Sequence, residues 1–122
     1  MTTQQTVLII DDDLSLQNLL EIALREAGYN VVLANDGEEG LEKLAAVKPS
    51  LVISDIMMPQ LDGVETFHRM KDTLQTEGIP VFIMTALSRK PWFADLEAEG
   101  AVIIQKPFEI DQVINLARDL LS

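Results

Sequence analysis

Five short apolar runs recur along the chain, and they constrain its fold more than any other feature. Each is rich in valine or isoleucine and is uninterrupted by alternating polar residues: 7–10, 31–34, 51–53, 81–84 and 101–104. Runs of this kind are typical of strands that are covered on both faces, as in the parallel sheets of α/β proteins. The sequence therefore predicts a parallel sheet of five strands.

Between these runs, apolar residues recur every three or four positions, which indicates amphipathic helices. The first helix is expected to end at Gly28. The second is expected to begin at Asp36, with Glu39 in a capping-box position, and to stop before Lys48 and Pro49. Helices therefore alternate with the predicted strands.

Three of the predicted helices carry clear apolar stripes, and we expect these stripes to face the sheet. A short further helix is expected within residues 89–99, with Pro91 in its first turn and Phe93 and Leu96 turned inward. The stripes of the first, third and last helices are Leu16, Leu19, Leu20, Ala23, Leu24 and Ala27; Val64, Phe67, Met70, Lys71 and Leu74; and Ile110, Val113, Ile114, Ala117 and Leu121.

Five strand-helix units joined by right-handed connections form an open, doubly wound sheet. We therefore expect an α/β fold with a doubly wound, five-stranded parallel sheet. The length of 122 residues fits one domain, which we assign to residues 1–122.

The composition excludes several classes of protein. The chain has 9 Lys and Arg against 20 Asp and Glu, which gives a net charge of −11 and disfavours direct binding to nucleic acid. The absence of cysteine excludes disulfides and thiolate metal sites. No apolar run approaches the roughly 20 residues that span a bilayer, so a soluble, cytoplasmic protein without membrane contact is expected.

Polar side chains follow four of the five runs. Acids follow the first and third, at residues 11–13 and at Ser54 and Asp55, whereas Thr85 follows the fourth and Lys106 the fifth. Because ligands of such sheets gather beyond the carboxyl ends of the strands, these groups are expected to meet at one edge. Asp13, taken singly, also fits the N-cap of the first helix.

The charges at this edge indicate a cation site. Asp11, Asp12 and Asp55 repel one another at close range, and Lys106 offsets only one of their charges. Oxygen ligands favour Mg²⁺, and a chain with no cysteine and one histidine argues against zinc or copper. An aspartate beside Mg²⁺ can attack phosphorus, and Asp55 is the best candidate, with Thr85 and Lys106 stabilising the transferred group.

Four motifs at these positions resemble the receiver domains of two-component response regulators, of the single-domain chemotaxis kind. The resemblance extends from about Thr6 to Leu121. The motifs are Leu-Ile-Ile-Asp-Asp at 8–12, Val-Ile-Ser-Asp-Ile-Met-Met-Pro at 52–59 followed by Asp-Gly at 62–63, Met-Thr-Ala at 84–86 and Lys-Pro-Phe at 106–108.

This resemblance implies a flavodoxin-like (βα)5 fold with strand order 2-1-3-4-5, and it implies roles for individual residues. Asp55 would be the phosphoacceptor, Thr85 the switch hydroxyl and Lys106 the partner of the phosphate. Asp12, Asp55 and the Met57 carbonyl would ligate Mg²⁺ directly, and Asp11 would act through water. The peptide bond between Lys106 and Pro107 would be cis, an isomer accessible before proline.

Three residues depart from the family pattern or bear on it. Ile103 stands where many members have tyrosine or phenylalanine, so the aromatic part of the usual switch is not expected. Met57 and Leu87 occupy positions that influence how water reaches the phosphate, and both are apolar here. We therefore expect slow loss of the phosphoryl group.

Two residues remain open to alternative interpretations. Trp92 either covers the core at a helix start or, if exposed, anchors a partner protein. His68 is expected on the polar side of the third helix, with no sign of a role as phosphodonor.

The resemblance implies a phosphoacceptor that takes phosphoryl from a sensor histidine kinase or a histidine phosphotransfer protein and changes its affinity for a downstream effector. It would be no enzyme beyond its own phosphorylation and dephosphorylation. Two alternatives stay open: a haloacid-dehalogenase-like phosphatase with Asp11 as nucleophile, and a receiver-like interaction module that is not phosphorylated. We expect a free-standing regulator, although a piece of a longer one would have the same sequence.

Overall fold

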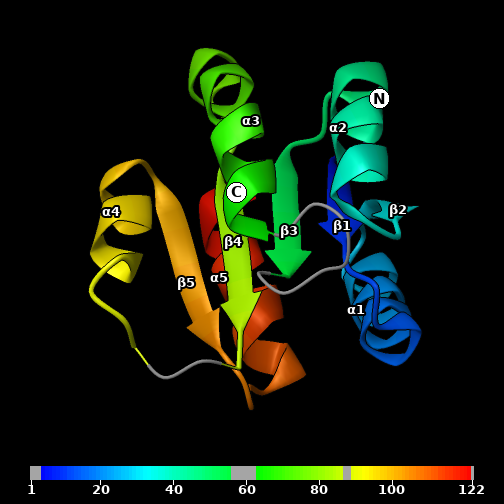
Figure 1. Ribbon diagram of the computed structural model, residues 1–122. Helices are drawn as coiled ribbons and strands as arrows, with labels where there is room; N and C mark the ends of the chain where they lie inside the picture. Colours follow the sequence, from blue (N-terminus) through cyan, green and yellow to red (C-terminus); the bar gives the residue numbers. More distant parts are fainter. Residues whose placement is uncertain (1–3, 56–62, 87–88, 122) are drawn as a thin grey trace.

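The computed structural model describes residues 4–55, 63–86 and 89–121 (Figure 1). Five strands alternate with five helices, as the sequence predicted. They are β1 (Thr6–Ile10), α1 (Leu14–Glu26), β2 (Asn30–Ala34), α2 (Gly37–Val47), β3 (Leu51–Asp55), α3 (Gly63–Glu77), β4 (Val81–Thr85), α4 (Phe93–Ala98), β5 (Ala101–Gln105) and α5 (Ile110–Leu121).

The strands form one parallel sheet in the order β2-β1-β3-β4-β5. This confirms the predicted doubly wound, flavodoxin-like fold. In the register of the sheet, Ile10 lies opposite Ser54, Asp55 opposite Met84, and Thr85 opposite Gln105. The carboxyl ends of four neighbouring strands therefore lie side by side.

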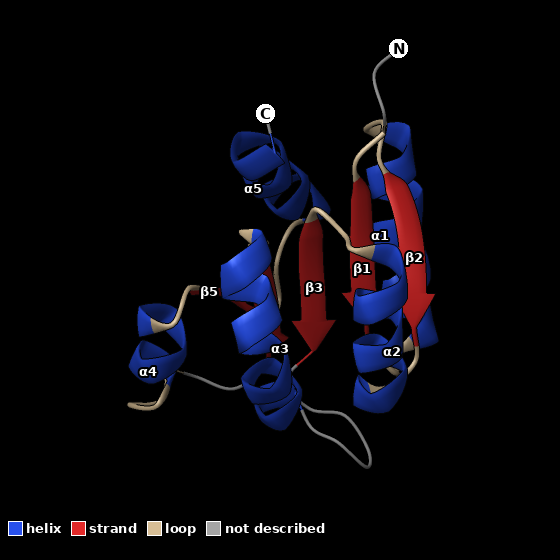
Figure 2. Cartoon of the chain, turned by 90° about the horizontal axis from the view of Figure 1, so that it is seen from above, coloured by secondary structure: helices blue, strands red, loops and turns tan. Residues whose placement is uncertain are grey.

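Helices cover both faces of the sheet, which explains why the strand sequences do not alternate (Figures 1 and 2). Val7 and Ile9 of β1 belong to a core cluster with residues of α1 and α5. Leu8 and Ile10 of the same strand belong to a second cluster with residues of α2, α3 and α4. Successive residues of β1 thus pack in the two hydrophobic clusters on opposite faces of the sheet.

Side chains of the expected types mark the helix ends. Asp13 caps α1, because its carboxylate accepts hydrogen bonds from the backbone amides of Ser15 at 3.0 Å and Leu16 at 3.3 Å. Asp36 caps α2 through the Glu39 amide at 2.8 Å. These contacts confirm both predicted helix starts.

The apolar stripe of α1 was predicted one residue too wide. Leu20 and Leu24 are buried as expected, but Leu19 is 56% exposed and lies on the outer side with Leu14 and Ile22. The third inward position is filled by the polar residue Gln17 instead. A helix of 3.6 residues per turn cannot direct both Leu19 and Gln17 at the sheet.

The remaining predicted stripes agree with the structure. Phe67, Met70 and Leu74 of α3 and Val113, Ile114 and Ala117 of α5 are buried. Helix α4 is shorter than the range 89–99 suggested, but Phe93 and Leu96 are buried as predicted. Among the residues that the structure describes, no helix combines the length and apolar character needed to span a bilayer.

Candidate functional site

Three carboxylates meet at the carboxyl ends of β1 and β3. Asp11 and Asp12 directly follow β1, and Asp55 is the last residue of β3. One oxygen from each carboxylate lies within 4.8 Å of the other two. Asp11 is fully buried and Asp55 is 6% exposed, whereas Asp12 faces solvent. The predicted acidic cluster is therefore present, with one side open.

Asp11 is the fully buried member of this cluster. Its Oδ1 atom accepts a hydrogen bond from the Asp13 amide at 2.9 Å, but its buried Oδ2 atom has no hydrogen-bond partner among the described residues. Burial, together with the nearby charge of Asp55, raises the pKa of Asp11 from 3.8 to about 6, against the opposing effects of the Asp13 amide and Lys106. An unpartnered oxygen in a cluster of acids fits a cation such as Mg²⁺.

Lys106 and Thr85 complete the edge of the sheet. The Lys106 ammonium lies 3.4 Å from Oδ2 of Asp55 and offsets part of the negative charge. Thr85 is fully buried at the end of β4, and its carbonyl accepts a hydrogen bond from the Lys106 amide at 2.7 Å. The peptide bond between Lys106 and Pro107 is cis, as the resemblance implied.

Gln17 of α1 contacts the ends of β1 and β2, a role that the sequence pattern did not predict. The side-chain amide of this buried α1 residue lies within hydrogen-bond distance of the Asp11 carbonyl at 3.2 Å, the Ala34 carbonyl at 3.1 Å and the Asn35 side chain at 3.3 Å. It thereby joins α1 to the ends of β1 and β2. The available signal was its spacing, because Gln17 stands three residues before Leu20 and so shares the inward side of the helix.

Some predicted positions lie elsewhere. Met57 and Leu87 are outside the described residues. Ile103 is half-buried and packs against the cluster that contains Ile83 and Phe93, as an aliphatic core residue. His68 is exposed on α3, as expected.

Comparison with known proteins agrees with this geometry. The family model described as the response regulator receiver domain matches residues 7–118. The response regulator MprA of Mycobacterium leprae is 35% identical over 116 residues, which are 94% of this chain and 50% of that protein. MprA of Mycolicibacterium vanbaalenii is 34% identical over 94% of this chain and 49% of its own length. The chain thus spans about half the length of these curated relatives.

Solved structures are similar over nearly their whole length. The chemotaxis response regulator CheY4 of Vibrio cholerae has a TM-score of 0.86 at 28% identity, covering 97% of this chain and 99% of that one. A response regulator from Chloroflexus aurantiacus has a TM-score of 0.86 at 31% identity, covering 98% of both chains. With the family model matched from the first strand into the last helix, the chain belongs to the response regulator receiver domains.

Proposed function

We propose that this receiver domain takes a phosphoryl group from the phosphohistidine of a partner onto Asp55 and thereby changes its affinity for a downstream protein. The observation that carries the proposal is the surroundings of the Asp55 carboxylate. It is almost buried, lies 3.4 Å from the Lys106 ammonium and shares a cluster with Asp11 and Asp12. A carboxylate held between a cation and a metal-binding pocket is suited to attack phosphorus.

The proposed transfer is a displacement at phosphorus. A carboxylate oxygen of Asp55 forms the new P–O bond while the P–N bond to the donor histidine breaks, and the electron pair stays on the imidazole nitrogen. Lys106 offsets charge on the transferred oxygens, and the Thr85 hydroxyl donates a hydrogen bond to one of them. The hydrogen bond from the Lys106 amide to the Thr85 carbonyl holds these two residues side by side at the ends of β4 and β5.

Mg²⁺ would be held by Asp12, Asp55 and the Met57 carbonyl, with Asp11 acting through water. The Oδ2 atom of Asp11, which has no hydrogen-bond partner among the described residues, and the three clustered carboxylates support this assignment. When bound, Mg²⁺ supplies positive charge that neutralises the acids and the phosphoryl oxygens. The pocket then accepts an anion that the acids alone would repel.

The phosphodonor, a histidine kinase or a histidine phosphotransfer protein, would contact the exposed apolar side of α1. Leu14, Leu19 and Ile22 are 61%, 56% and 57% exposed, and Leu14 comes directly after the Asp13 cap. A histidine that reaches Asp55 must approach over this edge of the sheet. Apolar side chains beside the site would then contribute to binding.

The phosphorylated state is expected to persist. Neither Met57 nor Leu87 has a polar side chain that could orient a water molecule toward the phosphoryl group. We expect the label on Asp55 to decay over minutes or longer in purified protein with Mg²⁺, measured by intact mass after removal of the donor. Decay within seconds would contradict this expectation, and Leu87→Asn should shorten the lifetime.

Incubation with acetyl phosphate and Mg²⁺ tests the proposal, with intact and tandem mass spectrometry as the readout. We expect one added phosphoryl group on Asp55, absent in Asp55→Asn and in the presence of EDTA. Asp111→Asn, an exposed aspartate of α5, is the matched control and should be labelled normally. Label on Asp11 would favour the phosphatase alternative, and no label at all would favour an interaction module without phosphorylation.

A further inference from the structure

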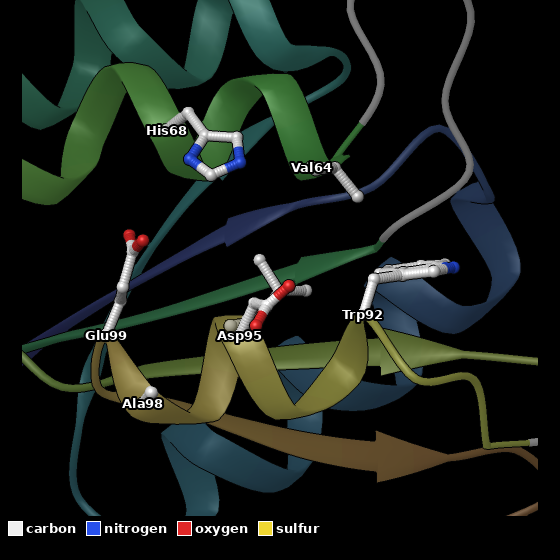
Figure 3. A pocket seen from close by; sticks show the side chains of 7 residues that line it. Val64, His68, Trp92, Asp95, Ala98 and Glu99 are labelled. Atoms are coloured by element: carbon white, nitrogen blue, oxygen red, sulfur yellow. The ribbon is translucent and has the colours of Figure 1, made fainter.

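A groove separates α3 from α4 on the face of the sheet that carries both helices (Figure 3). Its volume is about 590 Å³. The lining residues that bear on its chemistry are Val64 and His68 from α3, and Trp92, Asp95, Leu96 and Glu99 from α4 and its flanks. It is separate from the acidic cluster that would bind Mg²⁺.

Trp92 supplies the large aromatic surface of this groove. It is the single tryptophan of the chain and is 36% exposed. Its ring packs edge-on against buried Phe93, with 4.6 Å between centroids, so the indole has a fixed support. The exposed position favours the interpretation of Trp92 as a partner anchor over that of a core cover.

Asp95 contributes a negative charge to the lining of the groove. Glu99 is paired with Lys71 at 3.2 Å, and Glu97 is paired with Arg89. Asp95 is exposed, and within the described part of the chain its carboxylate forms neither a hydrogen bond nor an ion pair. Figure 3 shows this carboxylate between Trp92 and Glu99, across the groove from His68. The groove therefore combines the negative charge of Asp95 with an indole and the apolar side chains of Val64 and Leu96.

We propose that this groove binds a segment of a partner protein through one arginine side chain of that segment. The guanidinium would pair with Asp95 and lie against the Trp92 ring, while neighbouring apolar residues contact Val64 and Leu96. Arginine suits the site better than lysine because its planar, weakly hydrated group both pairs with carboxylates and stacks on aromatic rings. The net charge of −11 also favours a cationic partner.

The position of the groove relates it to Asp55. Helix α3 follows β3, which ends at Asp55, and α4 follows β4, which ends at Thr85. A bound segment would thus contact the two helices that come after the proposed phosphorylation site. The identification of its source as the downstream effector rests on the proposed function, whereas binding of the arginine does not.

The test uses the full chain, labelled with ¹⁵N, and a blocked five-residue peptide with arginine at its centre between leucines. The same peptide with citrulline keeps the shape and removes the charge. We expect the arginine peptide to shift the Trp92 indole resonance and the amides of 92–99, and to bind about fivefold more tightly than the citrulline peptide. Asp95→Asn should remove that preference, whereas Asp111→Asn should leave it unchanged.

Equal binding of the two peptides, absence of binding, or shifts confined to residues outside the groove would overturn the proposal. Changes of the same resonances on dilution without peptide would assign the groove to a second copy of the chain and overturn it as well. If the arginine peptide binds but acetyl phosphate does not label the chain, the proposed binding of arginine in the groove is supported and the proposed function is contradicted. If Asp55 is labelled but the peptide does not bind, only the proposed binding of arginine in the groove is contradicted.

Discussion

The Asp11 carboxyl group has an unfavourable environment in the folded protein, and this has a measurable consequence for stability. Its pKa is raised to about 6 from 3.8, chiefly by burial. Below about pH 3 the group is protonated in both the folded and the unfolded states, so it contributes no penalty. As the pH rises toward 6 the unfolded chain releases the proton first, and the free energy of unfolding falls.

We therefore predict that Asp11→Asn stabilises the protein in EDTA at pH 7.5, by roughly 1–3 kcal/mol, and by much less at pH 4. The asparagine oxygen can still accept the hydrogen bond from the Asp13 amide. Urea unfolding at the two pH values measures the difference. A parent and variant with the same pH dependence would show that the Asp11 carboxyl group is not held in this environment.

Gln17 contributes through hydrogen bonds that an apolar residue of similar size cannot make. Gln17→Met is predicted to lower the free energy of unfolding by roughly 1–3 kcal/mol, because the Asp11 and Ala34 carbonyls lose a donor in a buried place. Gln112→Met, at an exposed position of α5, is the matched control and should change stability little. Equal effects of the two substitutions in urea unfolding would contradict the role of Gln17.

Helix α2 approaches β1 closely, and Gly40 makes this possible. A Cβ atom at Gly40 would lie 2.5 Å from Cδ1 and 2.9 Å from Cγ1 of Ile10. Gly40→Ala is therefore predicted to destabilise the protein by about 1–3 kcal/mol through overpacking, even though alanine favours helices. Ile10 is itself buried at the end of the strand before Asp11.

A double-mutant cycle separates overpacking from other effects. Ile10→Val removes the Cδ1 atom, so the Gly40→Ala substitution should cost less in its presence than in the parent. Chemical unfolding of the four proteins measures the coupling. Strictly additive effects would indicate that the two residues do not meet.

The strands and most helix ends could be predicted from the sequence because each depends on local chemistry. Uninterrupted apolar runs indicate strands with two buried faces, and Asp13 and Asp36 satisfy free amides at helix starts. The inward face of α1 could not be predicted fully, since leucine at position 19 has the same local character as Leu20. The inward side carries Leu20 and Leu24, and the buried hydrogen bonds of Gln17 lie on that same side.

The candidate site depends on the topology of the whole molecule. Asp11, Asp55, Thr85 and Lys106 are distant in sequence, and the strand order places their positions along one edge of the sheet. Their convergence could be predicted because each follows an apolar run. The burial of Asp11, the 3.4 Å separation of Lys106 and Asp55, and the groove beside Trp92 could not, because they depend on side-chain packing between distant elements.

Titration calorimetry with Mg²⁺ on the full chain tests most directly whether the carboxylates of Asp11, Asp12 and Asp55 form one cation site. We predict one Mg²⁺ bound per chain, with weaker binding in Asp12→Asn and unchanged binding in Asp111→Asn. Near pH 6 the parent should also release protons as the ion binds, because Asp11 is partly protonated there. Absence of Mg²⁺ binding, or equal affinity in Asp12→Asn, would contradict a magnesium site at this edge of the sheet.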